Sequence, residues 1–203
     1  LTDQIEIHFI PEVYPGYFWI FPTSATEANV GLGISTELLT KRGETLPELF
    51  EKALHSSKVA HRFSSIKKQT PFRAWRIPTQ YKKDTLVAKD TVFLVGDAAG
   101  IVDIFTGEGV GNAMKSGHIV GQAILKNHSA TKYTKTLQKE MLRELKISRS
   151  VYMLTRKMPL LFNKIISLCE KSPRLVQWLL DVAMDDNRRK ELLNPAKYLK
   201  LIL

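Results

Sequence analysis

The sequence of 203 residues contains a single cysteine, Cys169. One thiol forms neither an internal disulfide nor a multi-thiolate metal centre, so we expect no metal site and a reducing compartment. No apolar run approaches the roughly 18 to 20 residues that cross a bilayer. The first residues also lack the basic and then apolar segments of a secretory signal. These absences predict a cytoplasmic protein.

The sequence also lacks internal repeats and low-complexity tracts, while 44% of its residues are hydrophobic. That fraction supplies a core for one large domain or two small ones and argues against disorder.

Positive charge is concentrated near the C-terminus. Residues 131–203 hold 16 Lys and Arg against 7 Asp and Glu, which gives about +9 of the net +10. Such a region could face anionic lipid, nucleic acid or an acidic protein, or it could be an ordinary solvated surface. Nucleic acid is disfavoured because the basic residues lack regularly spaced stacking aromatics. A lipid-facing arrangement would place Lys135, Lys139, Arg143, Lys146 and Arg149 beside Leu142, Leu145 and Val151.

The first 78 residues carry mainly strand patterns. Ile5, Ile7 and Phe9 alternate with polar residues, and residues 17–21 and 29–34 flank a polar turn, which predicts a hairpin. Gly31 and Gly33 share one face of the second strand, where a ligand or a packed aromatic ring could approach. A helix is expected over 46–54 and an extended segment over 66–77.

Tyr17, Trp19 and Phe21 are spaced by two, so they share one face of the predicted strand. Three rings on one face suit a pocket for a long apolar chain, and they equally suit a filled core. Spacing alone favours the core.

A buried strand over 91–95 is expected to end in the sequence Gly-Asp-Ala-Ala-Gly at 96–100, and a helical period starts at Glu108. Small residues let a ligand touch the backbone, and the free N–H groups of a helix entrance attract an electron-rich group. Asp97, at the end of the strand, could accept hydrogen bonds from hydroxyls. Alternatively, Asp97 is a turn residue and Glu108 only complements the helix N-terminus.

Residues 96–110 resemble the second flavin-binding motif of the geranylgeranyl reductase family, within the flavoproteins that fold like p-hydroxybenzoate hydroxylase. The resemblance implies that FAD binds here. It assigns the ribityl chain to the aspartate matching Asp97 and the flavin ring to the backbone of the helix entrance. Ala113, Ser116 and Gly117 match small residues of the following helix. The family usually has proline where this sequence has Ile104, which leaves the loop less stiff. The predicted cofactor-binding residues are Gly96, Asp97, Ala98, Gly107, Glu108, Gly109 and Val110.

A second similarity covers residues 15–22, which match the family's aromatic signature. It implies that Tyr17, Trp19 and Phe21 line the substrate cavity. Trp75, Ile77 and Pro78 match more loosely. Beyond His128 we expect successive helices, broken at Pro159, Pro173 and Pro195.

The predicted fold is α+β, with part of a substrate domain over 1–78, part of an FAD domain over 79–127 and a helical region over 128–203. The family's usual GxGxxG opening, which holds the ADP part of FAD, is absent, so we expect a fragment that binds FAD weakly or not at all and is inactive alone.

The resemblance implies reduction of carbon–carbon double bonds in prenyl groups by FAD, with NAD(P)H or a ferredoxin-like protein as electron donor and peripheral contact with a membrane. No proton donor is assigned, because neither His8 nor Cys169 lies in a matched motif. Alternatives are a flavin monooxygenase or halogenase, a quinone-linked electron-transfer flavoprotein, and a non-catalytic basic membrane-binding module.

Overall fold

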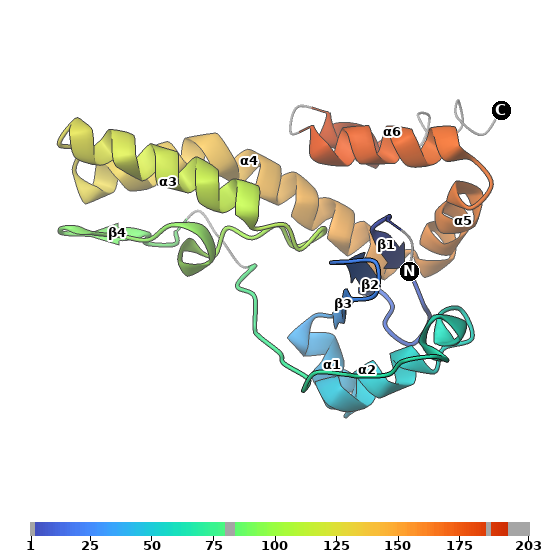
Figure 1. Cartoon of the computed structure of the whole chain (residues 1–203). Helices are drawn as coiled ribbons and strands as arrows, with labels where there is room; N and C mark the ends of the chain where they lie inside the picture. Colours follow the sequence, from blue (N-terminus) through green and yellow to red (C-terminus); the bar gives the residue numbers. More distant parts are fainter. Residues whose placement is uncertain (1–2, 80–83, 186–187, 195–203) are drawn as a thin grey trace. The chain divides into compact units, whose positions relative to one another are not determined.

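The computed structural model describes residues 3–79, 84–185 and 188–194. The chain forms two compact units, Leu1–Trp75 and Arg76–Leu203. The described residues contain six α-helices and two small antiparallel sheets, so the predicted α+β class is confirmed (Figure 1). The predicted division into three parts, at residues 78 and 127, stays a prediction.

The first unit is built on a three-stranded antiparallel sheet in the order β1 (Glu6–His8), β2 (Tyr17–Pro22) and β3 (Ala28–Gly33). The predicted hairpin between β2 and β3 is confirmed, with Trp19 opposite Gly31. Phe18 and Ile20 point to the inner face, where they pack with Leu49 of α2 (Leu46–Leu54) in a core. The helix expected over 46–54 is therefore confirmed.

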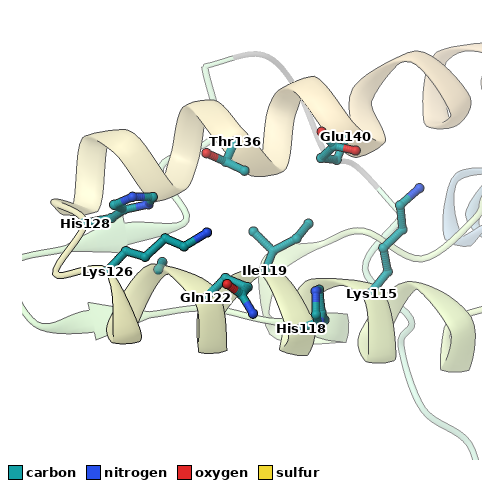
Figure 2. A pocket seen from close by; sticks show the side chains of 9 residues that line it. Lys115, His118, Ile119, Gln122, Lys126, His128, Thr136 and Glu140 are labelled. Carbon is teal, nitrogen blue, oxygen red and sulfur yellow. The ribbon is translucent and has the colours of Figure 1, made fainter.

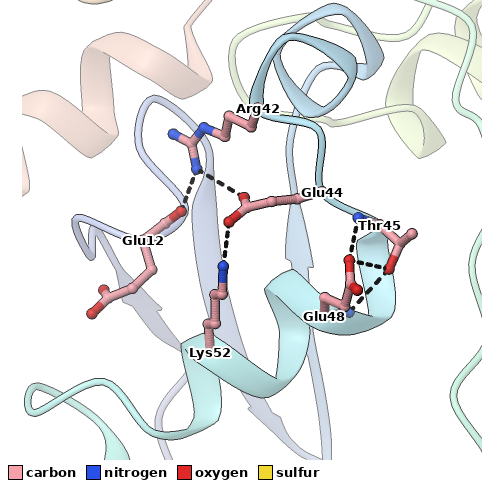
Figure 3. A network of polar contacts seen from close by, with 6 residues as sticks. All are labelled: Glu12, Arg42, Glu44, Thr45, Glu48 and Lys52. Carbon is pink, nitrogen blue, oxygen red and sulfur yellow. Dashed lines mark hydrogen bonds and ion pairs between the residues drawn. The ribbon is translucent and has the colours of Figure 1, made fainter.

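The helices α1 (Thr36–Arg42) and α2 are joined by a short polar connection. Thr45 and Glu48 form a reciprocal capping box at the start of α2, in which Glu48 accepts from the Thr45 N–H at 2.8 Å (Figure 3). Glu44, which precedes α2, forms an ion pair with Lys52, one helical turn after Glu48. These contacts fix where α2 begins and thus which of its residues meet the sheet.

The segment expected to be extended over 66–77 joins no sheet. Trp75 is 86% exposed, and Ile66 and Ile77 are also exposed. Phe72 is anchored by its ring, which lies 5.1 Å from that of Phe50. The segment is thus irregular, and most of its large apolar side chains do not join the core.

The second unit begins with a small hairpin of β4 (Ala88–Lys89) and β5 (Val92–Phe93). The prediction of a strand over 91–95 buried on both faces is wrong: the strand is shorter, and Val92 is 62% exposed. The cause is one-sided packing. Phe93 meets the ring of Tyr133 edge-on at 5.2 Å, while no described element covers Val92 on the other face.

Helices make up the rest of the second unit: α3 (Val110–Leu125), α4 (Ala130–Lys157), α5 (Pro159–Cys169) and α6 (Pro173–Met184). The predicted breaks at Pro159 and Pro173 are confirmed, because each proline begins a helix. Pro195 lies outside the described residues. The helices α3 and α4 pack side by side around Ile119, Tyr133 and Leu137 (Figure 1).

Candidate functional site

The predicted strand–loop–helix connection is present in the second unit. After β5 the chain makes one turn of 3-10 helix over Gly96–Ala99, in which Gly96 has a φ of 52°. A Cβ atom at Gly96 would lie 3.1 Å from the Cβ of Ala113 on α3, so glycine is required both for the backbone angle and for this approach. The Gly96 N–H donates to the Ser116 hydroxyl at 3.0 Å. These contacts hold the start of the loop against α3.

Asp97 and Gly109 are brought together by the loop. Asp97 is exposed, and a Cβ atom at Gly109 would lie 3.3 Å from its carboxylate oxygen Oδ1. Ala98 is exposed beside it. The carboxylate therefore stands next to the helix entrance, where Gly109 has no side chain of its own and Val102 also lies close, 3.4 Å from the position of that Cβ. A carboxylate acceptor thus lies beside the N–H donors of a helix entrance, a combination that suits a ligand with both hydroxyls and an electron-rich group.

The entrance of α3 is formed by Gly107, Glu108, Gly109 and Val110. Gly107 has a φ of 73°, and Val110 is 75% exposed. Glu108 turns its carboxylate back to accept from the Gly111 N–H, which is the helix-complementing role considered from the sequence. Within the described residues no acceptor is present for the N–H groups of Val110 and Asn112. A ligand at the helix entrance would supply these two donors with an acceptor.

Asp103 organises the middle of the loop, and sequence reasoning did not single it out. Its side chain is fully buried and accepts from the N–H groups of Phe105 at 2.8 Å and Thr106 at 3.0 Å. Its second carboxylate oxygen accepts from the hydroxyl of Ser148 on α4. An aspartate whose side chain accepts from the N–H groups two and three residues later is a common turn signal, so this role of Asp103 could be found in the sequence. Nothing in the sequence indicates that Ser148 is its third partner.

Backbone hydrogen bonds close the loop without the proline that the family usually has at position 104. The Gly107 N–H donates to the Asp103 carbonyl, and the Asp103 N–H donates to the Glu108 carbonyl, each at 2.9 Å. The Asn112 side chain on α3 also donates to the Ile101 carbonyl at 2.7 Å. The loop around Ile104 is thus held at both ends.

The aromatic residues of β2 form a second candidate site, in the first unit. Tyr17, Trp19 and Phe21 lie on the sheet face opposite the core, and all three are half-buried. Neighbouring rings are 6.0 Å and 5.9 Å apart, and the Trp19 indole donates to Asn29 at 2.8 Å. The preference for core packing that came from spacing alone is therefore wrong, because Phe18 and Ile20 of the alternate face fill the core.

Gly31 explains how Trp19 lies flat on this face. A Cβ atom at Gly31 would stand 2.3 Å from Cζ2 of the indole, so the missing side chain makes room for the ring. Of the two occupants considered from the sequence, a packed aromatic ring fills the space. With Ile7, which is 50% exposed opposite Trp19, the rings form an apolar wall.

A groove of about 500 Å³ lies between α3 and α4, further along α3 than the helix entrance (Figure 2). Its lining includes the buried Ile119 and Ala123 together with Lys115, Lys126 and His128. Burial, together with Lys132 and Lys126, lowers the pKa of His128 from its ordinary value, which favours the neutral ring. None of the predicted cofactor-binding residues lines this groove.

Comparison with known proteins identifies the family. Residues 2–68 match the geranylgeranyl reductase catalytic domain. The chain is 32% identical over 167 residues to the digeranylgeranylglycerophospholipid reductase of Methanocaldococcus jannaschii, covering 81% of this chain and 39% of the relative. It is 35% identical over 119 residues to digeranylgeranylglycerophospholipid reductase 1 of Methanopyrus kandleri, covering 57% of this chain and 30% of the relative.

A solved structure shares the fold. A geranylgeranyl bacteriochlorophyll reductase-like protein from Thermoplasma acidophilum aligns with a TM-score of 0.56 at 22% identity, over 88% of this chain and half of that one. The chain therefore belongs to the geranylgeranyl reductase family, as its motifs predicted. It spans less than half the length of these curated relatives.

Proposed function

We propose that this protein takes part in the FAD-dependent reduction of carbon–carbon double bonds in a prenyl lipid. The observation that carries the proposal is the exposed Asp97 carboxylate beside Gly109 at the entrance of α3. The similarity to two digeranylgeranylglycerophospholipid reductases supports the substrate class.

The residues at the helix entrance fit FAD. The carboxylate of Asp97 is an acceptor suited to the ribityl hydroxyls. The N–H groups of Val110 and Asn112, which have no acceptor among the described residues, suit the electron-rich edge of the flavin ring. When bound in its reduced form, FAD would supply a hydride to one carbon of the double bond and be left oxidised. The second carbon takes a proton, and no donor is assigned to it.

The chain's own contribution to this chemistry is binding and orientation. The loop contacts of Asp103 keep Gly107 and Gly109 in place, so the donors at the helix entrance need not reorganise as negative charge develops. Tyr17, Trp19 and Phe21 offer an apolar wall for the prenyl chain, and such a wall also excludes water.

The electron donor of the proposed reaction is NAD(P)H or a ferredoxin-like protein, and a prenyl lipid as substrate implies peripheral contact with a membrane. No helix in the described parts of the chain is long and apolar enough to cross one.

Because the 203 residues alone are expected to be inactive, they are joined to a GxGxxG-containing segment of a family member, and the joined protein is incubated anaerobically with a digeranylgeranyl glycerophospholipid and excess chemically reduced FAD. A high flavin concentration compensates for weak binding. Mass spectrometry should show products that gain one pair of hydrogen atoms per reduced bond, with less product from Gly109→Ala and an unchanged amount from Gly121→Ala. A Cβ at Gly121 meets no atom within 4 Å. Oxygenated products formed only in air would favour a monooxygenase, and absence of any product from the folded protein would contradict the proposal.

A further inference from the structure

The connection between α4 and α5 exposes a compact group of apolar side chains. We name it the 158–161 corner; it consists of Met158, Pro159, Leu160 and Leu161. Leu160 is 85% exposed, Met158 46% and Leu161 42%. Exposed leucines are ordinary when single, but three large apolar residues within four positions form a patch.

The local backbone explains why these side chains point outward. Met158 leaves the helical conformation, with a φ of −127° and a ψ of 63°, and Pro159 begins α5 in a new direction (Figure 1). The buried residue of α5 is Phe162, at 9% exposure. Leu160 precedes it by two positions, about half a helical turn, and therefore points away from the interior.

The charge around the corner has one sign. Residues 145–169 contain five Lys and Arg and no Asp or Glu. Lys157 and Lys164 flank the corner and are exposed, and neither belongs to an ion pair within the described part of the chain. The corner therefore combines insertable side chains with cations that no neighbouring acid neutralises.

The face of α4 that the sequence suggested for lipid does not offer this combination. Lys135, Lys139 and Arg143 are exposed. Leu142 and Leu145, however, are partly buried against the core formed around Tyr133 and Leu137, and Val151 is buried in another cluster. That face is a solvated basic surface with little apolar area available for insertion.

We propose that the 158–161 corner docks the protein on an anionic bilayer. Met158, Leu160 and Leu161 enter the boundary between head groups and acyl chains, while Lys157 and Lys164 contact lipid phosphates. Charge complementarity favours a membrane over a protein partner. A protein partner would need an apolar centre surrounded by acidic residues, whereas an anionic membrane has both an apolar interior and a negatively charged surface. The inference rests on the proposed function only in that a lipid substrate brings the protein to a membrane.

Flotation with vesicles of phosphatidylglycerol and phosphatidylcholine tests the corner. We expect the 203-residue protein to bind at low salt and to be released substantially at about 0.5 M NaCl, where charges are screened beyond roughly 4 Å. Binding of Leu160→Ser/Leu161→Ser should fall at least about tenfold. Binding of Lys157→Glu/Lys164→Glu should fall by a similar factor, because each lysine near the surface contributes about fivefold.

Matched control variants distinguish vesicle binding through the 158–161 corner from nonspecific binding. Ile124→Ser/Leu125→Ser replaces an exposed apolar pair at the end of α3, where the side chains are 59% and 79% exposed. Lys135→Glu/Lys139→Glu makes the same charge change on α4. Both controls should retain most of the binding, and circular dichroism checks that every variant is folded.

Three results would overturn the proposal: no binding of the unaltered protein at low salt, equal losses in the controls, or corner variants that change only the oligomeric state. The assay involves no catalysis, so its failure leaves the reductase proposal standing. Vesicle binding without prenyl reduction would count against the reductase proposal alone.

Discussion

The carboxylate of Asp103 accepts a hydrogen bond from the hydroxyl of Ser148, a residue 45 positions further along the chain. The contact ties the loop before α3 to the middle of α4, and both side chains are buried. A buried carboxylate is costly unless its oxygens are satisfied, and here two backbone N–H groups and one hydroxyl satisfy them.

Asp103→Ala should therefore lower the free energy of unfolding by about 2 to 4 kcal/mol, because it leaves buried donors without an acceptor. Ser148→Ala should cost about 1 to 2 kcal/mol, since it removes one partner of the buried carboxylate. Urea denaturation followed by circular dichroism measures both. Ser150→Ala, on the exposed side of α4, is the control and should change stability by less than about 0.5 kcal/mol. Equal changes in the free energy of unfolding for Ser148→Ala and Ser150→Ala would contradict a stabilising hydrogen bond between Ser148 and Asp103.

Gly31 and Gly33 form a matched pair beneath the Trp19 indole. Alanine at 31 would place its Cβ 2.3 Å from the ring, whereas alanine at 33 would be 3.9 Å away, which is ordinary contact. We expect Gly31→Ala to displace the indole and to destabilise the protein by about 1 to 3 kcal/mol. Gly33→Ala should be tolerated. Chemical denaturation compares the two, and similar stabilities would show that the ring does not depend on this glycine.

Thr45 begins α2 through its capping box with Glu48. Thr45→Ala should lower the free energy of unfolding by about 1 kcal/mol, as is usual for a lost N-cap. Thr36→Ala, at an exposed position at the start of α1, is a suitable control. Thermal unfolding followed by circular dichroism distinguishes them. No difference between the variants would mean that the box does not set the start of α2.

The same contacts give a pH dependence. Hydrogen bonds from the Thr45 backbone and side chain lower the pKa of Glu48 from its ordinary value of 4.5. Because the pKa of Glu48 is lower in the folded protein, its ionised carboxylate contributes fully to stability above pH 4.5. This contribution is lost as the pH falls through the lowered folded-state pKa. The Thr45→Ala variant should therefore lose less stability than the unaltered protein on acidification below pH 4.5. NMR titration of Glu48 checks the direction of the shift.

The sequence predicted those parts of the fold that local patterns determine. The β2–β3 hairpin follows from two strand-like runs around a polar turn, and α2 follows from apolar residues spaced by three and four and from Pro47 near its start. The loop at 96–110 was recognisable because its glycines meet backbone requirements that few other residues satisfy, as the positive φ of Gly96 and Gly107 shows.

Other features depend on contacts distant in sequence. The exposure of Val92 depends on Tyr133 covering only the opposite side of the hairpin, and the satisfaction of Asp103 depends on Ser148. The aromatic triplet illustrates the same limit. Its spacing of two placed Tyr17, Trp19 and Phe21 on one face, but only the packing of α2 determined which face became the core.

Cys169 should react slowly with thiol reagents. Burial, with a smaller contribution from Glu170, raises the pKa of its thiol, so less thiolate is present at any neutral or mildly basic pH than in a free cysteine. Modification by a chromogenic disulfide reagent at pH 8 should be several times slower in the native protein than in urea. Equal rates would show that the thiol is not shielded.

The last prediction addresses the proposed flavin site directly. Alanine at Gly109 would bring a Cβ to 3.3 Å from the Asp97 carboxylate and 3.4 Å from Val102, so the carboxylate must shift. Asp97→Ala removes that acceptor altogether. We expect Asp97→Ala to weaken FAD affinity roughly tenfold, the equivalent of one lost hydrogen bond to a charged group, and Gly109→Ala to weaken it by a smaller factor.

Quenching of flavin fluorescence gives the affinities, with Gly121→Ala as the unaffected control. Because Asp97 is exposed, its replacement should leave stability unchanged, which separates a binding role from a structural one. If all three variants bind FAD as the unaltered protein does, the helix entrance of α3 is not where the cofactor lies.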